Sequence, residues 1–165
     1  MTCFPPVVGT DARALILGSF PSGESLRRKQ YYGHPRNQFW RIMGDLFGAG
    51  PEKDYEERKE ILRRNGISLW DSVRTCTRET SADSRIRDAG YNDIEEFLKM
   101  HPGIKAIFFD GATAALLFNR GRRGKPDLKI PRITLPSTSP AHAAMKYEEK
   151  LERWKIIEEI VRREA

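Results

Sequence analysis

The sequence has only two cysteines, Cys3 and Cys76, among its 165 residues. Two thiols cannot form a disulfide framework, and they cannot supply the four thiolates of an iron–sulfur cluster. No apolar run approaches the roughly 20 residues that a membrane-spanning helix needs. The short apolar cluster at residues 4–8 has no basic leader before it, so we expect neither a secretory signal nor a membrane anchor. These absences favour a protein of the reducing cytoplasm.

Three common signatures of catalysis or binding are also missing. The His, Cys, Asp and Glu residues show no spacing typical of a zinc site. No Gly-x-Ser-x-Gly turn is present, and the serines have no obvious partner base. Residues 18–25 (GSFPSGES) are rich in glycine and serine, but they lack the spacing and the final Lys-Ser/Thr of a P-loop. We therefore expect no bound metal and no cofactor.

The charge balance is basic, with a formal net charge of +6 at pH 7. Because phosphate contacts dominate nucleic-acid affinity, this charge suits a polyanionic partner. The densest cationic segment, residues 120–125 (RGRRGK), is equally compatible with a solvated loop. Many basic proteins bind no nucleic acid, so the charge by itself does not identify the partner.

Short apolar runs alternate with amphipathic or charged segments along the chain. The runs that predict strands are residues 14–20, 67–73, 105–109 and 132–135. The segments that predict helices are residues 37–47, 55–64, 112–118, a helix capped by Asn92 or Asp93 that runs through Met100, and a C-terminal helix with an apolar stripe from Tyr147 to Val161. Strands that alternate with helices favour an α/β domain with a mostly parallel sheet covered on both faces.

Three loops leave the carboxyl ends of the predicted strands, at residues 18–25, 110–111 and 136–142. Ligands of parallel α/β sheets bind outside these ends, so we expect the three loops to converge on one site. Backbone N–H groups of the first loop can bind a phosphate or a developing anion. The same residues are also compatible with a plain turn from strand to helix.

Residues 31–40 (YYGHPRNQFW) allow two interpretations. Tyr31 and Tyr32 can stack on a planar base, which contributes about 1–3 kcal/mol, or they can pack the loop onto the core. Asn37 can hydrogen-bond a base edge or a water, or it can cap the helix that follows. One side-chain oxygen is not expected to serve both purposes. His34 is a candidate acid or phosphate contact, although a lone histidine in a loop is more often structural.

Residues 135–142 (LPSTSPAH) form a stiff segment rich in hydroxyl groups. Ser137, Thr138 and Ser139 lie between two prolines and can hold phosphate oxygens, which hydroxyls and amides contact as well as cations do. His142 follows at the predicted start of the last helix. A proline-stiffened turn with a helix cap accounts for the same residues without a ligand.

Taken in order, these segments resemble the uracil-DNA glycosylase superfamily. The recurring pattern there is a strand ending Gly-x-x-Pro, an aromatic residue, a Pro-containing turn, Asn-x-Phe-Trp and a later Pro-Ser loop. This chain matches it with Gly18-Ser19-Phe20-Pro21, Tyr32, Pro35, Asn37-Gln38-Phe39-Trp40 and Leu135-Pro136-Ser137. The resemblance is closest to the mismatch-specific and thymine-DNA glycosylase branch and to the hypoxanthine-DNA glycosylases.

The resemblance implies a single three-layer α/β/α domain, residues 1–165, that flips a nucleotide out of the duplex into a pocket at the strand ends. Tyr32 is expected to stack on the flipped base, and Asn37 is the catalytic candidate, acting on the base or on water. The candidate base-binding residues are Gly18, Ser19, Phe20, Tyr32 and Asp110. The candidates for binding DNA phosphates, or for filling the gap left in the duplex, are Ser22, Ser137, Thr138, Ser139 and His142.

The chain departs from the family pattern at two places. Phe20 stands where relatives carry a water-activating Asp or Asn, so this task falls to another group such as Asn37, or catalysis relies on stabilising the departing base. Hypoxanthine glycosylases share the Gly-Ser-Phe-Pro version, which favours deoxyinosine as the substrate. The Pro-Ser loop lacks the His of efficient uracil enzymes and the Leu or Arg wedge of other branches.

We therefore expect a monomeric, monofunctional DNA glycosylase without a cofactor, acting on double-stranded DNA that contains deaminated or mismatched bases. It would hydrolyse the N-glycosidic bond of hypoxanthine, uracil or both and start base excision repair in the cytoplasm of a bacterium or archaeon, at the nucleoid. No lysine matches a pocket position, so a Schiff-base lyase step is not expected. Two alternatives stay open: a non-catalytic DNA-binding module that keeps the pocket, which Phe20 favours, and a hydrolase of small nucleosides, which the basic charge disfavours.

Overall fold

Four parallel strands form the central sheet of the computed structural model, which describes residues 1–162 apart from the side chain of Ser84. In spatial order they are β2 (Ile67–Asp71), β1 (Ala14–Gly18), β5 (Ala106–Asp110) and β6 (Arg132–Leu135). The register pairs Gly18 with Asp71, and Asp110 with Leu135. The carboxyl ends of the strands therefore lie level at one end of the sheet, where the sequence predicts a site.

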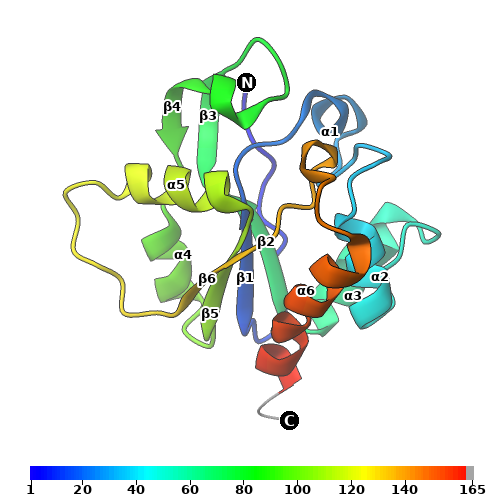
Figure 1. Ribbon diagram of the computed structural model, residues 1–165. Coiled ribbons are helices and arrows are strands. Elements are labelled where there is room, and N and C mark those ends of the chain that lie inside the picture. Colours follow the sequence, from blue (N-terminus) through cyan, green and yellow to red (C-terminus); the bar gives the residue numbers. More distant parts are fainter. Residues whose placement is uncertain (163–165) are drawn as a thin grey trace.

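Helices cover both faces of this sheet, which confirms the three-layer α/β/α class (Figure 1). One face carries α2 (Phe39–Phe47), α3 (Tyr55–Arg64) and α6 (Tyr147–Arg162), and the other carries α4 (Ile94–Met100) and α5 (Ala112–Gly121). Successive strand residues point to opposite faces, so Ile16 packs in the first layer and Leu17 in the second. Residues 163–165 of the expected domain lie outside the described residues, and the domain boundaries stay a prediction.

A two-stranded antiparallel hairpin lies beside the sheet, and the sequence pattern does not predict it. It consists of β3 (Val73–Thr77) and β4 (Arg87–Tyr91), joined through the short 3-10 helix η1 (Asp83–Arg85). The apolar run 67–73 predicts one strand, but β2 ends at Asp71 and Val73 already belongs to the hairpin. β4 (RDAGY) lacks the alternation of apolar and polar residues that marks a half-buried strand. Figure 1 shows the hairpin at the same end of the molecule as the first helix, near the carboxyl ends of the strands.

Two short helices occupy segments that the sequence analysis treats as loops. α1 (Gly23–Arg28) follows Ser22, whose Oγ accepts a hydrogen bond from the backbone N–H of Ser25 at 3.1 Å. The 3-10 helix η2 (Pro140–His142) follows Ser139, whose Oγ caps it. The prediction that His142 starts the last helix is wrong, because His142 ends this separately capped turn and α6 begins only at Tyr147.

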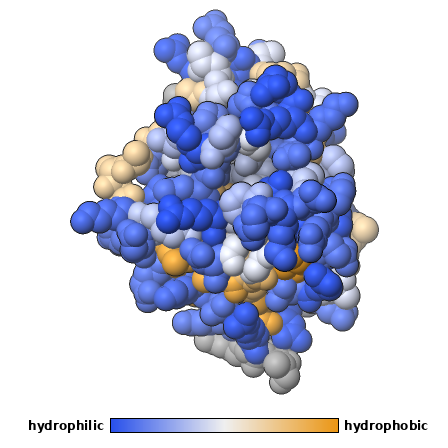
Figure 2. Space-filling model, turned by 90° about the vertical axis from the view of Figure 1, so that its right-hand side faces the viewer, coloured by the Kyte–Doolittle hydropathy of each residue, from blue (hydrophilic) through white to orange (hydrophobic). Residues whose placement is uncertain are grey.

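The side of the molecule that carries α2, α3 and α6 shows mostly hydrophilic side chains, with apolar ones in small spots (Figure 2). Extensive apolar patches are typical of protein–protein interfaces. The expected monomeric state is compatible with this face and stays a prediction. None of the helices within residues 1–162 has the length and apolar composition needed to cross a bilayer.

Trp154 of α6 links the helical layer to the Pro-Ser loop, so truncating it should destabilise the fold. Its side chain is fully buried, its ring contacts Phe39 edge-on at 6.0 Å between centroids, and its Nε1 donates a hydrogen bond to the Pro136 carbonyl at 2.9 Å. We expect Trp154→Ala to lower the free energy of unfolding by about 3–5 kcal/mol, measured by urea denaturation. Leu116→Ala, which truncates a half-exposed side chain on α5, is the control and should stay within about 0.5 kcal/mol. Equal effects of the two variants would contradict this role.

Candidate active site

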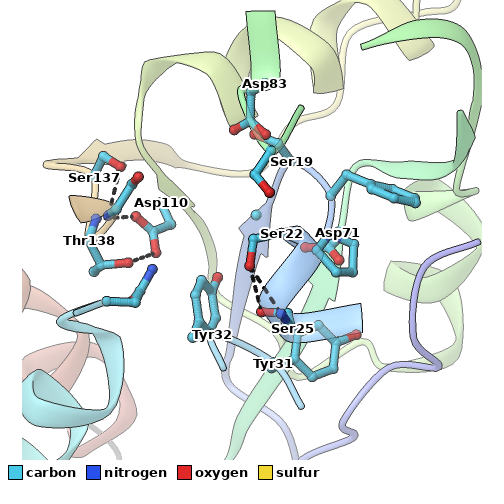
Figure 3. A pocket seen from close by; sticks show the side chains of 16 residues that line it. Ser19, Ser22, Ser25, Tyr31, Tyr32, Asp71, Asp83, Asp110, Ser137 and Thr138 are labelled. Atoms are coloured by element: carbon cyan, nitrogen blue, oxygen red, sulfur yellow. Dashed lines mark hydrogen bonds between the residues drawn. The ribbon is translucent and has the colours of Figure 1, made fainter. Parts of the chain in front are cut away.

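The three predicted loops meet around one cavity at the carboxyl ends of the strands, as the sequence analysis expects. Every candidate base-binding or phosphate-binding residue except His142 lines it, as does Asn37. In Figure 3, Thr138 and Asp110 lie on one side of the cavity, Ser22 and Asp71 on the other, and Tyr32 between them. The cationic segment 120–125 and His34 do not line this cavity.

The cavity has a volume of about 110 Å³ and is open to the surface. Pockets for drug-sized ligands are larger, about 300–1,000 Å³, whereas an engineered cavity of about 150 Å³ accepts benzene. The site therefore suits one planar ring system rather than an extended ligand.

Gly18, the last residue of β1, leaves room for two polar groups beside it at the cavity wall. A Cβ at this position would lie 2.7 Å from Oδ1 of Asp71 and 3.1 Å from the hydroxyl oxygen of Tyr32. Atoms at 2.7 Å would collide, so a side chain at position 18 would push the Asp71 carboxyl or the tyrosine out of place. The match to the Gly-x-x-Pro motif thus has a steric cause.

The two adjacent tyrosines have different environments. Tyr31 is buried in the core: its hydroxyl donates to the Pro5 carbonyl at 2.9 Å, and its N–H donates to the Tyr55 hydroxyl at 2.9 Å. Tyr32 lines the cavity, and its ring stacks on Phe39 with centroids 3.9 Å apart. Burial raises the pKa of Tyr32 well above its ordinary value, so its hydroxyl stays protonated. Tyr31 also lines the cavity, but its hydrogen bonds and burial hold it in the core, and stacking of a base on Tyr32 stays a prediction.

Asn37 lines the cavity and also caps α2. Its Oδ1 accepts a hydrogen bond from the backbone N–H of Phe39, the first residue of α2, at 2.8 Å. The side-chain oxygen of Asn37 thus bonds the start of α2, as the capping interpretation expects, although Gln38 occupies the N-cap position and its side chain makes no capping bond. Since an amide carries two N–H donors besides this oxygen, the Nδ2 group is the part of Asn37 that remains for a ligand.

Asp110, at the end of β5, holds the Pro-Ser loop. Its carboxyl oxygens accept hydrogen bonds from the N–H and the hydroxyl of Thr138, at 2.8 and 2.7 Å. Burial raises the pKa of Asp110 to about 6, while the two bonds from Thr138 act in the opposite direction. Thr138 is only 1% exposed, so its hydroxyl is directed to Asp110 in this structure.

The rest of the Pro-Ser loop is held by further buried donors. Nζ of Lys150, a buried lysine of α6, donates to Oε1 of Gln38 at 3.0 Å and to the His142 carbonyl at 2.7 Å. Oγ of Ser137 accepts a hydrogen bond from the N–H of Ser139 at 3.1 Å, and Oγ of Ser139 accepts one from the N–H of Ala141 at 3.2 Å. A serine oxygen that accepts from the backbone still has a hydroxyl proton to donate. The loop therefore presents two oriented serine hydroxyls, and His142 is exposed beside them.

Two carboxyl groups of the cavity, Asp71 and Asp83, are not among the predicted site residues, because in a chain with 23 acidic residues a lone aspartate such as Asp71 is not informative. Asp71 is the last residue of β2, as Asp110 is the last residue of β5, and this shared position could have marked it. Asp83 comes from η1, and no local pattern marks it as part of the site. Arg78 ties this part of the hairpin to the first loop, because it donates to the Pro21 carbonyl at 2.5 Å and lies 3.5 Å from the Asp83 carboxylate.

Removing the Thr138 hydroxyl should raise the pKa of Asp110 above about 6, because hydrogen bonds to the charged form of an acid stabilise that form. We expect Thr138→Val, which keeps the shape of the side chain, to show this shift in a ¹³C NMR titration of the Asp110 carboxyl. It should also cost about 1–3 kcal/mol of stability through an unsatisfied acceptor. Thr134→Val, at an exposed position of β6, is the control and should leave the Asp110 titration unchanged. A downward shift in Thr138→Val would contradict the assigned role.

Comparisons with known proteins agree with this geometry. A hypoxanthine DNA glycosylase from Methanosarcina barkeri is 41% identical over 109 residues, which is 66% of this chain and 69% of that protein. A hypoxanthine DNA glycosylase from Methanosarcina acetivorans is 42% identical over 112 residues, or 67% of this chain and 71% of that protein. The solution NMR structure of a candidate uracil DNA glycosylase from Methanosarcina acetivorans superposes with a TM-score of 0.75 and 35% identity, covering 93% of both chains.

The family model of the uracil DNA glycosylase superfamily matches residues 5–160, which includes every residue of the cavity wall. The match and the two relatives extend the resemblance from the short motifs to most of the domain. The chain belongs to the uracil DNA glycosylase superfamily.

Proposed function

We propose that this DNA glycosylase removes hypoxanthine, the deamination product of adenine, from double-stranded DNA by hydrolysing the N-glycosidic bond. The observation that carries the proposal is a ring-sized cavity at the strand ends whose wall contains Gly18, Tyr32 and Asn37. Two relatives at 41% and 42% identity are hypoxanthine DNA glycosylases. The Gly-Ser-Phe-Pro sequence of the first loop, shared with that branch, supports the same substrate.

The reaction needs a flipped nucleotide and a stabilised leaving group. Flipping costs a few kcal/mol and is easiest for a poorly paired base. As the C1′–N9 bond breaks, the sugar becomes cation-like and the base takes the bonding electrons. Water then supplies a hydroxyl group to C1′ and a proton to the base. Hydrogen-bond donors aimed at the departing base lower the barrier of the first step.

We assign the donor role to the Nδ2 group of Asn37. Its oxygen is held by the backbone of α2, which orients the amide at the cavity wall. Phe20 cannot activate water as the Asp or Asn of relatives does, because its side chain has no polar group. Its side chain packs among the apolar residues of the hairpin core, and the guanidinium of Arg78 lies 5.3 Å from its ring.

The DNA backbone has suitable partners around the cavity. Ser137 and Ser139 present hydroxyls at its wall, and the bonds between Thr138 and Asp110 position their loop. Ser22 also lines the cavity, but its hydroxyl donates to Oγ of Ser25 at 3.1 Å and would have to turn to contact a phosphate. Exposed His142 is the candidate for filling the gap in the duplex. A neighbouring cleft shares Tyr32 and Asn37 with the cavity and is lined by four arginines, Arg28, Arg36, Arg41 and Arg58. A basic cleft next to a base pocket suits the phosphates that flank a flipped nucleotide.

A panel of duplex oligonucleotides tests this function. Each duplex carries hypoxanthine, uracil, xanthine or thymine opposite each of the four bases, and the assay detects free base and the abasic site. We expect release of hypoxanthine, unaffected by a metal chelator. Equal, salt-dependent binding of damaged and undamaged DNA without base release would instead support the non-catalytic DNA-binding module. Turnover of free inosine would support the nucleoside hydrolase.

Two variants of Asn37 separate catalysis from capping. Asn37→Asp keeps an oxygen for the Phe39 N–H but removes the amide donors, so we expect unchanged or higher stability and a loss of roughly 10²–10³-fold in single-turnover base release. Asn37→Ala should lose the activity and, in addition, about 0.5–2 kcal/mol of stability.

The control for the capping effect is Asp93→Ala, which removes the cap of α4 away from the cavity. It should lower stability by a similar amount and leave base release unchanged. If Asn37→Asp releases hypoxanthine at the wild-type rate, Asn37 is only a helix cap.

A further inference from the structure

Asp71 is a carboxyl group of the cavity wall whose chemistry the proposed reaction does not yet use. It ends β2 next to Gly18 in the register, and it is only 4% exposed. Within the described part of the chain, its Oδ2 has no hydrogen-bond partner. Its Oδ1 lies against the wall position of Gly18, where the Tyr32 hydroxyl also approaches. Figure 3 shows Asp71 across the cavity from Asp110.

Asp71 and Asp110 differ in the hydrogen bonds that their carboxyl groups receive. Asp110 accepts two hydrogen bonds from Thr138, whereas no donor in the described residues reaches Oδ2 of Asp71. A buried carboxylate without donors is costly, so such a group keeps its proton instead. A neutral carboxyl group, unlike a carboxylate, has an O–H that can donate a hydrogen bond.

The charged groups around Asp71 also favour the protonated form of its carboxyl group. Burial raises the pKa of Asp71 to about 8, the charges of Asp83 and Asp110 act in the same direction, and Arg78 partly offsets them. The titratable or charged groups that interact with it, from the hairpin, β5, the loop before α2 and the N-terminal segment, are Arg78, Asp83, Asp110, Tyr31, Tyr32 and Cys3. Arg78 is the one cation among them, and its Nη1 lies 3.5 Å from the Asp83 carboxylate.

We propose, building on the function proposed above, that Asp71 is a catalytic residue that acts as a neutral acid and donates a hydrogen bond to the carbonyl oxygen of the flipped base. Hypoxanthine departs as an anion, and part of its negative charge resides on this oxygen. A preformed donor at that point stabilises the transition state more than the bound base. No proton needs to be transferred, since the base obtains its proton from the water that adds to C1′. A carboxylic acid kept neutral by its surroundings serves as such a donor in other enzymes.

The pH dependence of single-turnover hypoxanthine release tests the proposal. Once Asp71 ionises it cannot donate and repels the departing base, so wild-type activity should fall about tenfold per pH unit above about 8. Asp71→Asn keeps the shape and an N–H donor but does not titrate. It should act within about tenfold of the wild type at pH 7 and show no decline up to pH 10. Asp71→Ala should be at least about 100-fold slower at pH 7.

The control is Asp127→Asn, which neutralises an exposed carboxylate outside the cavity wall and should keep the wild-type alkaline decline. Circular dichroism and thermal unfolding confirm that each variant is folded. The proposal is overturned if the alkaline decline persists in Asp71→Asn, or if Asp71→Ala releases hypoxanthine at the wild-type rate.

A binding measurement separates this proposal from the proposed function. A duplex containing 2′-fluoro-2′-deoxyinosine resists cleavage, because the fluorine disfavours a cation-like sugar. In a ¹³C NMR titration, the Asp71 carboxyl should have a higher pKa in this complex than in the free protein, since a hydrogen bond from the acid favours the protonated form. That rise is expected even if the wild type releases no base, which would refute only the glycosylase proposal. An unchanged or lowered pKa in the complex would refute the role of Asp71.

Discussion

The close approach of Asp71 and of Tyr32 to Gly18 is the constraint on which the candidate site depends. β1 lies between β2 and β5, so its last residue is surrounded by the groups that the neighbouring strands and loops bring to the same end of the sheet. A side chain there would collide with the Asp71 carboxyl at 2.7 Å. With glycine at this position, a carboxyl from β2 and an aromatic ring from the loop before α2 can share one wall of a cavity for a single base.

The opposite wall, formed by Asp110 and the Pro-Ser loop, is held by hydrogen bonds. Leaving these polar groups unpaired would cost free energy of folding. Asp110 accepts both bonds from Thr138, and Lys150 and Trp154 of α6 hold the carbonyls of the Pro-Ser loop. Each of these groups is withdrawn from water and satisfied, as buried polar groups must be. On the other wall, Oδ2 of Asp71 has no hydrogen-bond partner among the described residues. The site thus has one wall of paired polar groups and another wall that holds an unpaired carboxyl oxygen.

Much of the fold and part of the site could be predicted from the sequence. The parallel sheet, its helices and the meeting of three loops follow from the alternation of apolar runs and from the geometry common to parallel α/β sheets. The hairpin was missed because β4, with the sequence RDAGY, carries no periodic apolar signal. Asp83 was missed with it. The helix cap at Asn37 was foreseen as one of two roles, but only the coordinates show which atom of the amide it occupies.

The sequence by itself determined the class of the protein, since ordered motifs from Gly18 to Ser137 identify the superfamily and local periodicity defines the elements between them. The tertiary structure alone decided which groups lie together and which hydrogen bonds each of them receives. Asp71 and Asp110 look alike in sequence, each an aspartate that follows an apolar run. They differ because Thr138, 28 residues from Asp110, donates two hydrogen bonds to it, while burial leaves Oδ2 of Asp71 without a donor. Solvation and hydrogen bonding depend on neighbours in space, and these are not encoded in any local pattern.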